Sequence, residues 1–196
     1  MKQIAFDIAI LPPDEIQDIC IELCHKYQNN SGRPPLNKKD NTPHISLLMG
    51  VVEEKKLPEL IEQTKKILKD KKTINLKIEK IQKIDSTYYF PITKNKKLQE
   101  LHELFVNQLP EFHSQKTTAD MYLDDIVADS TYFWTDNYAI GSSFAKFWSH
   151  ITLKACDNPE FKTFPLEFNA DKIAICHMGN HCTCRKILWQ SKLINK

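Results

Sequence analysis

The spacing of hydrophobic residues predicts that the chain opens with a strand followed by a helix. Residues 4–11 form an apolar, partly alternating run, which predicts a strand that ends at Pro12 and Pro13. The next apolar residues recur at helical spacing as far as Tyr27, and Asp14 stands where a capping residue is expected. A polar loop over residues 28–41 follows.

The same spacings predict a succession of strands and helices along the rest of the chain. The predicted elements are a strand from His44 to Val52, a helix over 58–68, a hairpin over 74–92 with a bend between Ile81 and Ile84, a helix over 96–109, and strands over 165–168, 172–177 and 185–193. The pattern degrades over 111–136, which is interpreted as an insertion with a short helix around 122–128. Mixed helices and hairpins with few parallel crossovers indicate an α+β fold, in one domain spanning residues 1–196.

One short pattern occurs on two of the predicted strands. It is His-Ile-Ser/Thr-Leu, and it occupies residues 44–47 and 150–153. Successive side chains of a strand point to opposite faces, so the histidine and the hydroxyl share one face while the apolar residues enter a core. Two such half-sites facing each other would supply a base, an acid and two hydrogen-bond donors, which are the groups that phosphodiester cleavage requires.

Composition narrows the kinds of partner. Arg33 and Arg185 are the only arginines and the net charge is +2, which excludes a wide arginine-rich phosphate footprint. With 4 glycines and no P-loop or dinucleotide fingerprint, a glycine-rich phosphate loop is not expected. No signal peptide or membrane-spanning run is recognisable, so we expect a soluble, cytoplasmic monomer whose 6 cysteines are thiols.

The two motifs and the order of the elements resemble the two-histidine phosphoesterase superfamily, which includes 2′-5′ RNA ligase-like proteins and cyclic nucleotide phosphodiesterases. One His-x-Ser/Thr tripeptide has little weight, but two of them, one in each half of the chain, are much more specific. Pro43 precedes the first histidine as in many members, whereas Ser149 stands where a second proline is common. The resemblance spans most of the chain.

The resemblance implies a bilobed fold of two pseudo-symmetric lobes, each with an antiparallel sheet and helices, and a central groove that holds both motifs. It implies a metal-independent phosphodiesterase without a cofactor, acting on 2′,3′-cyclic phosphate or 2′,5′-linked RNA or nucleotide substrates. The expected catalytic residues are His44, Ser46, His150 and Thr152. One neutral imidazole would act as base and one protonated imidazole as acid, with the hydroxyls donating to the phosphate oxygens; the sequence does not assign the two roles.

Four further residues are candidates for binding a short RNA end or a small nucleotide. Lys154 follows the second motif on the same strand face, and Arg33 lies in the loop that enters the first. Ordinary solvated charges are the alternative interpretation of both. Tyr88 and Tyr89 are neighbours on a predicted strand, so one of the two points away from the core and can stack a base.

Two alternatives stay open. The same groove could bind a nucleotide or RNA without turning it over, which would make the protein a non-catalytic binding module. Residues 176–184 are rich in cysteine and histidine, but their spacing lacks the Cys-x₂-Cys pattern of zinc sites. A hairpin with Cys176 and Cys184 facing each other is therefore favoured over a metal site.

Overall fold

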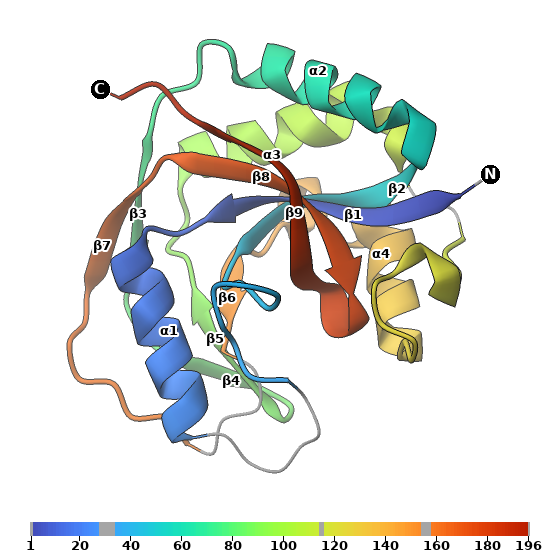
Figure 1. Ribbon diagram of the computed structural model, residues 1–196. Helices are drawn as coiled ribbons and strands as arrows, with labels where there is room; N and C mark the ends of the chain where they lie inside the picture. The colour runs from blue at the N-terminus through green and yellow to red at the C-terminus, as the bar shows by residue number, and fades with distance from the viewer. Residues whose placement is uncertain (1, 28–33, 114–115, 154–157, 196) are drawn as a thin grey trace.

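The computed structural model describes residues 2–27, 34–113, 116–153 and 158–195. Its first sheet has four antiparallel strands in the order β2-β1-β8-β9 (Figure 1). The bounds are Gln3–Leu11 for β1, Ile45–Glu53 for β2, Lys172–Gly179 for β8 and Thr183–Lys192 for β9. Within the described residues β2 pairs with β1 alone, so the first motif lies at an edge of this sheet.

The remaining strands form two ladders that a bridge connects. Strands β3 (Ile74–Ile78) and β7 (Leu166–Ala170) pair with each other, and β4 (Gln82–Ile84), β5 (Thr87–Pro91) and β6 (His150–Thr152) pair in that order. The bridge between Ile78 and Ile92 joins the ladders, and the Thr93 amide donates to the Lys77 carbonyl at 2.8 Å. The hairpin predicted over 74–92 is therefore present only in part: β4 and β5 form it, whereas β3 is separated from β4 at 79–81 and pairs mainly with β7, which was not predicted.

Three of the four α-helices found in the described residues coincide with the predicted ones. They are α1 (Asp14–Lys26), α2 (Leu57–Leu68) and α3 (Lys96–Gln108). Asp14 is the first residue of α1 rather than its cap, a position that Pro13 occupies. The Asp14 carboxylate still lies at the positive end of the helix dipole.

The fourth helix, α4 (Asp129–Gly141), was predicted wrongly as a shorter helix over 122–128. Its burial pattern explains the error, because Thr131 and Thr135 are buried whereas Phe133 and Ile140 are exposed. A helix that buries polar and exposes apolar side chains has no amphipathic period to detect. Helix α4 contacts β2 and lies on the side of the sheet opposite to α2 and α3 (Figure 1).

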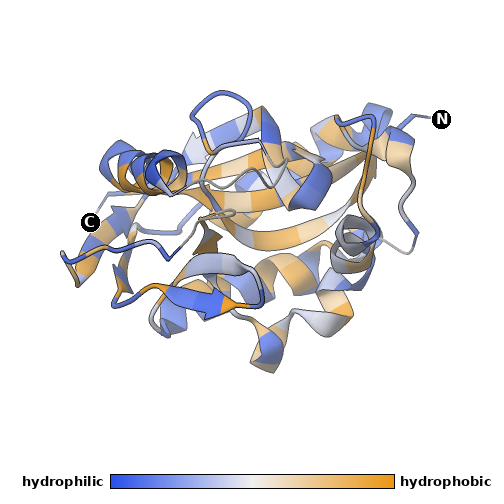
Figure 2. Ribbon diagram, turned by 90° about the horizontal axis from the view of Figure 1, so that it is seen from below, coloured by the Kyte–Doolittle hydropathy of each residue, from blue (hydrophilic) through white to orange (hydrophobic). Residues whose placement is uncertain are grey.

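Hydrophobic residues concentrate on the strands, between the layers of helices (Figure 2). The largest fully buried residues come from β1, β2, β3 and β5 and from helices α2 and α3; among them are Phe6, Ile45, Leu47, Phe90 and Phe105. In both motifs the isoleucine and the leucine are fully buried, as strand alternation predicts. Antiparallel sheets covered by helices confirm the α+β class. None of the described helices has the length and apolar character needed to span a membrane.

Strands β8 and β9 bring Cys176 and Cys184 together across the predicted hairpin, but not as directly opposite residues: Cys176 pairs with Ile187 and Cys184 with Met178, and the two cysteines form a disulfide. The expectation that every cysteine is a thiol was therefore wrong for these two. The register of β8 and β9 shifts on both sides of this point, and the two Cα atoms lie 5.5 Å apart, within the range that a disulfide spans. Register shifts of this kind are not visible in the sequence.

A buried histidine that sequence analysis did not single out ties the two motif strands together. His102 of α3 donates from Nδ1 to the carbonyl of Leu47, the last residue of the first motif, at 2.8 Å. Its Nε2 accepts from the Phe144 amide at 3.2 Å, and its ring stacks on Phe147 at 3.9 Å, shortly before the second motif. Both nitrogens are used only in the neutral ring, since a protonated ring has no acceptor.

This bonding predicts an acid-sensitive contribution of His102 to stability. Burial lowers the pKa of His102 below that of an unfolded histidine, so its contribution is complete above about pH 6.5 and is lost as the pH falls below that value. In His102→Gln, the thermal midpoint should decline less between pH 7.5 and pH 5 than in the wild type. Other buried histidines titrate in both proteins, so the difference between the two plots of thermal midpoint against pH isolates the contribution of His102. Equal slopes of these two plots would contradict the proposed contribution of the neutral His102 ring to stability.

Candidate active site

Each motif histidine is held by the same backbone hydrogen bond. His44 Nδ1 lies 2.8 Å from the Thr42 carbonyl, and His150 Nδ1 lies 2.9 Å from the Trp148 carbonyl. A carbonyl oxygen only accepts, so Nδ1 carries the proton in both rings and Nε2 is the nitrogen that can exchange a proton with a ligand. The carbonyl belongs in each case to the residue two positions before the histidine.

The four motif residues meet in one pocket. His44, Ser46, His150 and Thr152 all line it, and its volume is about 480 Å³. This volume lies within the range of about 300–1,000 Å³ that is usual for small-molecule sites. Because β2 and β6 are edge strands of different ladders and contact each other, the two half-sites share this pocket although more than a hundred residues separate them.

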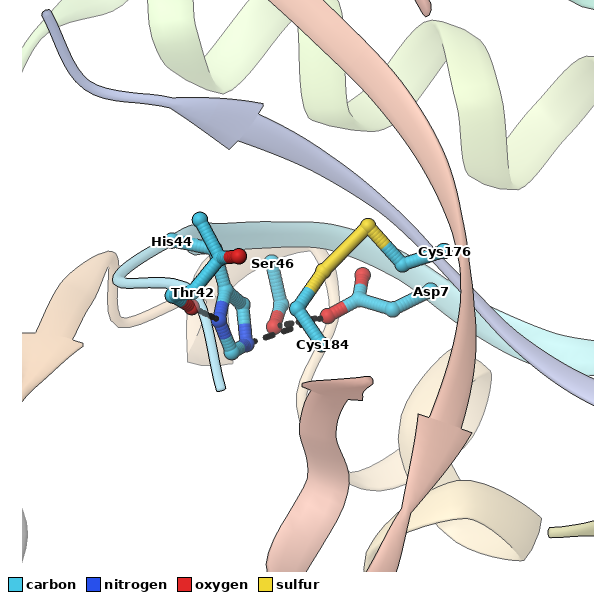
Figure 3. Close-up of a disulfide and its surroundings, with 6 residues drawn as sticks. All are labelled: Asp7, Thr42, His44, Ser46, Cys176 and Cys184. Atoms are coloured by element: carbon cyan, nitrogen blue, oxygen red, sulfur yellow. Dashed lines mark hydrogen bonds and ion pairs between the residues drawn. A yellow bond between two sulfur atoms is a disulfide. The ribbon is translucent and has the colours of Figure 1, made fainter. Parts of the chain in front are cut away.

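The first half-site stands on a buried carboxyl group. Asp7 of β1 is fully buried, and its Oδ2 accepts a hydrogen bond from Ser46 Oγ at 2.6 Å (Figure 3). His44 Nε2 lies 3.5 Å from the same oxygen. Burial raises the pKa of Asp7 well above that of an exposed carboxyl, and the bond from Ser46 offsets part of this effect.

The second half-site is built from aromatic rings instead. The His150 ring stacks on Trp148 with centroids 4.2 Å apart and meets the edge of Tyr89 at 4.9 Å. Burial against these rings lowers the pKa of His150 to about 4, because the charged imidazolium loses hydration there. His150 is therefore neutral at pH 7, with a lone pair on Nε2.

The predicted binding residues separate into three groups. Tyr89 lines the pocket, opposite Thr152 in the β5–β6 register. Tyr88 points away from it, is buried, and donates its hydroxyl to Asn158 Oδ1 at 2.6 Å. Lys154 and Arg33 lie outside the described residues.

Sequence analysis missed several residues that line the pocket. Lys146 follows α4, and Thr131, Trp134 and Tyr138 come from α4 itself. The Tyr138 hydroxyl also donates to the Ser46 carbonyl at 3.2 Å, which fastens α4 to the first motif. Without a recognisable period for α4, these side chains had no predicted location.

The predicted insertion packs against the turn between β8 and β9. Asp124 accepts from the Asn180 amide at 2.6 Å and pairs with Arg185 at 3.1 Å. Arg185, one of the two arginines, is thus engaged in a structural ion pair rather than in the pocket. Within the described part of the chain, no group of three or more His, Cys, Asp or Glu side chains has the arrangement needed to hold a metal ion.

The aromatic contacts predict that Trp148 keeps the pKa of His150 low. Trp148→Ala removes the stacked ring but keeps the backbone carbonyl, so solvent reaches the imidazole and its pKa should rise toward the ordinary value of about 6.5. The measurement is an NMR titration of the His150 ring signals. Trp134→Ala, which removes a pocket ring from the α4 side, is the matched control and should leave the titration unchanged. Equal titration curves for the wild type and Trp148→Ala would contradict the prediction.

Comparison with known proteins assigns the family. The chain matches the model of the 2′-5′ RNA ligase superfamily over residues 12–180, and no curated protein matches its sequence. Its structure is similar to TT0787 of Thermus thermophilus, with a TM-score of 0.62 and 14% identity over 98% of this chain and 100% of that chain. It is also similar to E. coli LigT complexed with 3′-AMP (TM-score 0.60, 14% identity, 98% and 99% of the two chains) and with NADP+ (0.58, 17%, 97% and 98%). Similarity at these identities shows the shared fold, and because the family model covers most of the sequence, the chain belongs to the 2′-5′ RNA ligase superfamily.

Proposed function

We propose that this protein is a metal-independent phosphodiesterase that acts on 2′,3′-cyclic phosphate or 2′,5′-linked RNA or nucleotide substrates. The observation that carries the proposal is the pair of histidines, each fixed through Nδ1 by a carbonyl two residues earlier and both lining one pocket. The proposal includes the two-lobed arrangement, with the motif strands β2 and β6 facing each other across the pocket.

The groups in the pocket fit the chemistry of phosphodiester hydrolysis. One imidazole removes a proton from the attacking water, and the other protonates the ribose oxygen that leaves phosphorus. Thr152 stands beside His150, where a hydroxyl group stabilises charge on a non-bridging oxygen, and Ser46 takes the same place beside His44 when its hydroxyl proton turns from Asp7 to the phosphate. Positioning and charge stabilisation account for most of the catalysis in phosphoryl transfer, so a covalent nucleophile is not needed.

The size and lining of the pocket favour a short substrate. Apart from histidines, Lys146 is the only cationic side chain among the described lining residues, which suits one phosphate better than a long polyanionic backbone. Tyr89 and Trp148 offer aromatic surface for stacking a base, a contact worth about 1–3 kcal/mol per base. The related LigT structures hold 3′-AMP, ATP and NADP+, which are nucleotides of the proposed size class.

The test is product analysis with EDTA present, on a short RNA that ends in a 2′,3′-cyclic phosphate and on 2′,5′-oligoadenylate. His44→Ala and His150→Ala should each lose activity by about 10²–10⁴-fold, because each removes a positioned acid or base. His25→Ala, an exposed histidine on α1, is the matched control and should keep wild-type activity.

Three outcomes would contradict the proposal. The first is activity that survives in the His44→Ala/His150→Ala double variant, the second is activity that EDTA abolishes, and the third is nucleotide binding without turnover at any pH. The third outcome would identify a binding module that uses the same pocket.

A further inference from the structure

Asp7 is a charge-bearing residue in a place where charge is costly. It is the only ionisable side chain of β1, a strand that pairs on both sides, and it is fully buried. Its Oδ1 has no hydrogen-bond partner among the described residues, whereas Oδ2 lies 2.6 Å from Ser46 Oγ and 3.5 Å from His44 Nε2. An isolated buried carboxyl is destabilising, so its position beside two pocket residues suggests a role there.

An irregularity in the β1–β2 pairing creates this arrangement. Ile8 pairs with Leu48 and Ala9 pairs with Ser46, so the register skips one residue between them. Asp7 and Ala9 lie on one face of β1, and Ser46 opposite Ala9 becomes a diagonal neighbour of Asp7 on that face. His44, two residues before Ser46, projects to the same side (Figure 3).

One of the groups that face Asp7 can become a cation. His44 approaches from β2, and Tyr138 of α4 interacts electrostatically with Asp7 and in turn with Cys182. On β8 the residue opposite Asp7 is Cys176, whose sulfur is bonded to Cys184 and does not titrate (Figure 3). Among these groups only His44 can carry a positive charge. His44 is therefore the group among them that can compensate a charge on Asp7.

We propose that Asp7 is a positioning residue that makes His44 the proton donor of the reaction. One oxygen of its carboxyl group holds both Ser46 and His44 in place. The Asp7–His44 pair retains the proton that Nε2 of His44 delivers. This inference rests on the proposed function and assigns the acid and the base within it. His150 is then the base. The described contacts of His150 are the Trp148 carbonyl and the rings of Trp148 and Tyr89, so a carboxyl group like Asp7 is not among them.

The assigned step is balanced. The oxygen of water forms a bond to phosphorus while its proton moves to Nε2 of His150. The bond between phosphorus and the leaving ribose oxygen breaks, and that oxygen takes the proton from Nε2 of His44. Afterwards His150 holds one proton more and the Asp7–His44 pair one fewer, and exchange with solvent restores both. The low pKa of His150, about 4, agrees with this direction, because the ring is neutral before the reaction.

The first test does not depend on turnover. An NMR titration of the wild type should show the His44 ring losing its proton above pH 6.5, while His150 is already neutral at that pH. In Asp7→Asn, which keeps the shape but not the charge, the pKa of His44 should fall by about one unit or more. A wild-type His44 that is neutral at and below pH 6.5, or an equal titration in the variant, would overturn the inference.

The second test is the pH dependence of kcat/KM on the RNA with a 2′,3′-cyclic phosphate end. Asp7→Asn should move the basic limb of the profile to lower pH by as much as it lowers the pKa of His44, and it should leave the acidic limb in place. A purely structural role would lower activity without moving either limb. Asp70→Asn, an exposed position after α2, is the matched control and should reproduce the wild-type profile.

The two tests separate the possible failures. If the wild type turns over no substrate, the proposed function fails while the NMR titration still decides the role of Asp7. If the wild type is active but the limb and the His44 titration are unmoved in Asp7→Asn, the function stands and the role of Asp7 is refuted.

Discussion

The antiparallel pairing of β1 with β2 is the constraint on which the candidate site depends. It leaves β2 as a sheet edge, and its register shift turns Ser46 toward Asp7. Pairing between β5 and β6 gives the second motif a corresponding edge position. His102 then connects the end of the first motif to the segment before the second, so packing of α3 fixes the two edges relative to each other. Three of the four motif residues, Ser46, His150 and Thr152, lie on strands and His44 directly precedes β2, which favours preorganised chemistry.

Two half-sites with nearly the same sequence have opposite electrostatic surroundings. Both rings are held by the same type of bond to a carbonyl, which leaves Nε2 for chemistry. Beside His44 the structure places a buried carboxyl group, whereas beside His150 it places Trp148 and Tyr89. A carboxyl favours a protonated imidazole and an aromatic wall favours a neutral one. The proposal for Asp7 rests on this difference between the neighbours of the two histidines.

Much of the fold and part of the site could be predicted because they follow from local patterns. Three helices, the hairpin and the strands that carry the motifs appear as hydrophobic periods in the sequence. Helix α4 does not, because Thr131 and Thr135 are buried while Trp134 is exposed at the pocket. The disulfide and the contact between Asp7 and Ser46 depend on register shifts between strands, which leave no local signal. A lone aspartate within the apolar run of β1 was the one available sign of a buried functional group.

The sequence by itself determined the α+β class and the four motif residues, because strand alternation fixes which side chains share a face. It also predicted that one of Tyr88 and Tyr89 points away from the core and can stack a base, because neighbouring side chains of a strand point to opposite sides. Only the tertiary structure decided that Tyr89 lines the pocket, that α4 forms one wall of it, and that Asp7 lies beneath the first motif. The physical reason is that alternation is a property of one strand, whereas register, burial and the charge near a titratable group depend on which segments pack together.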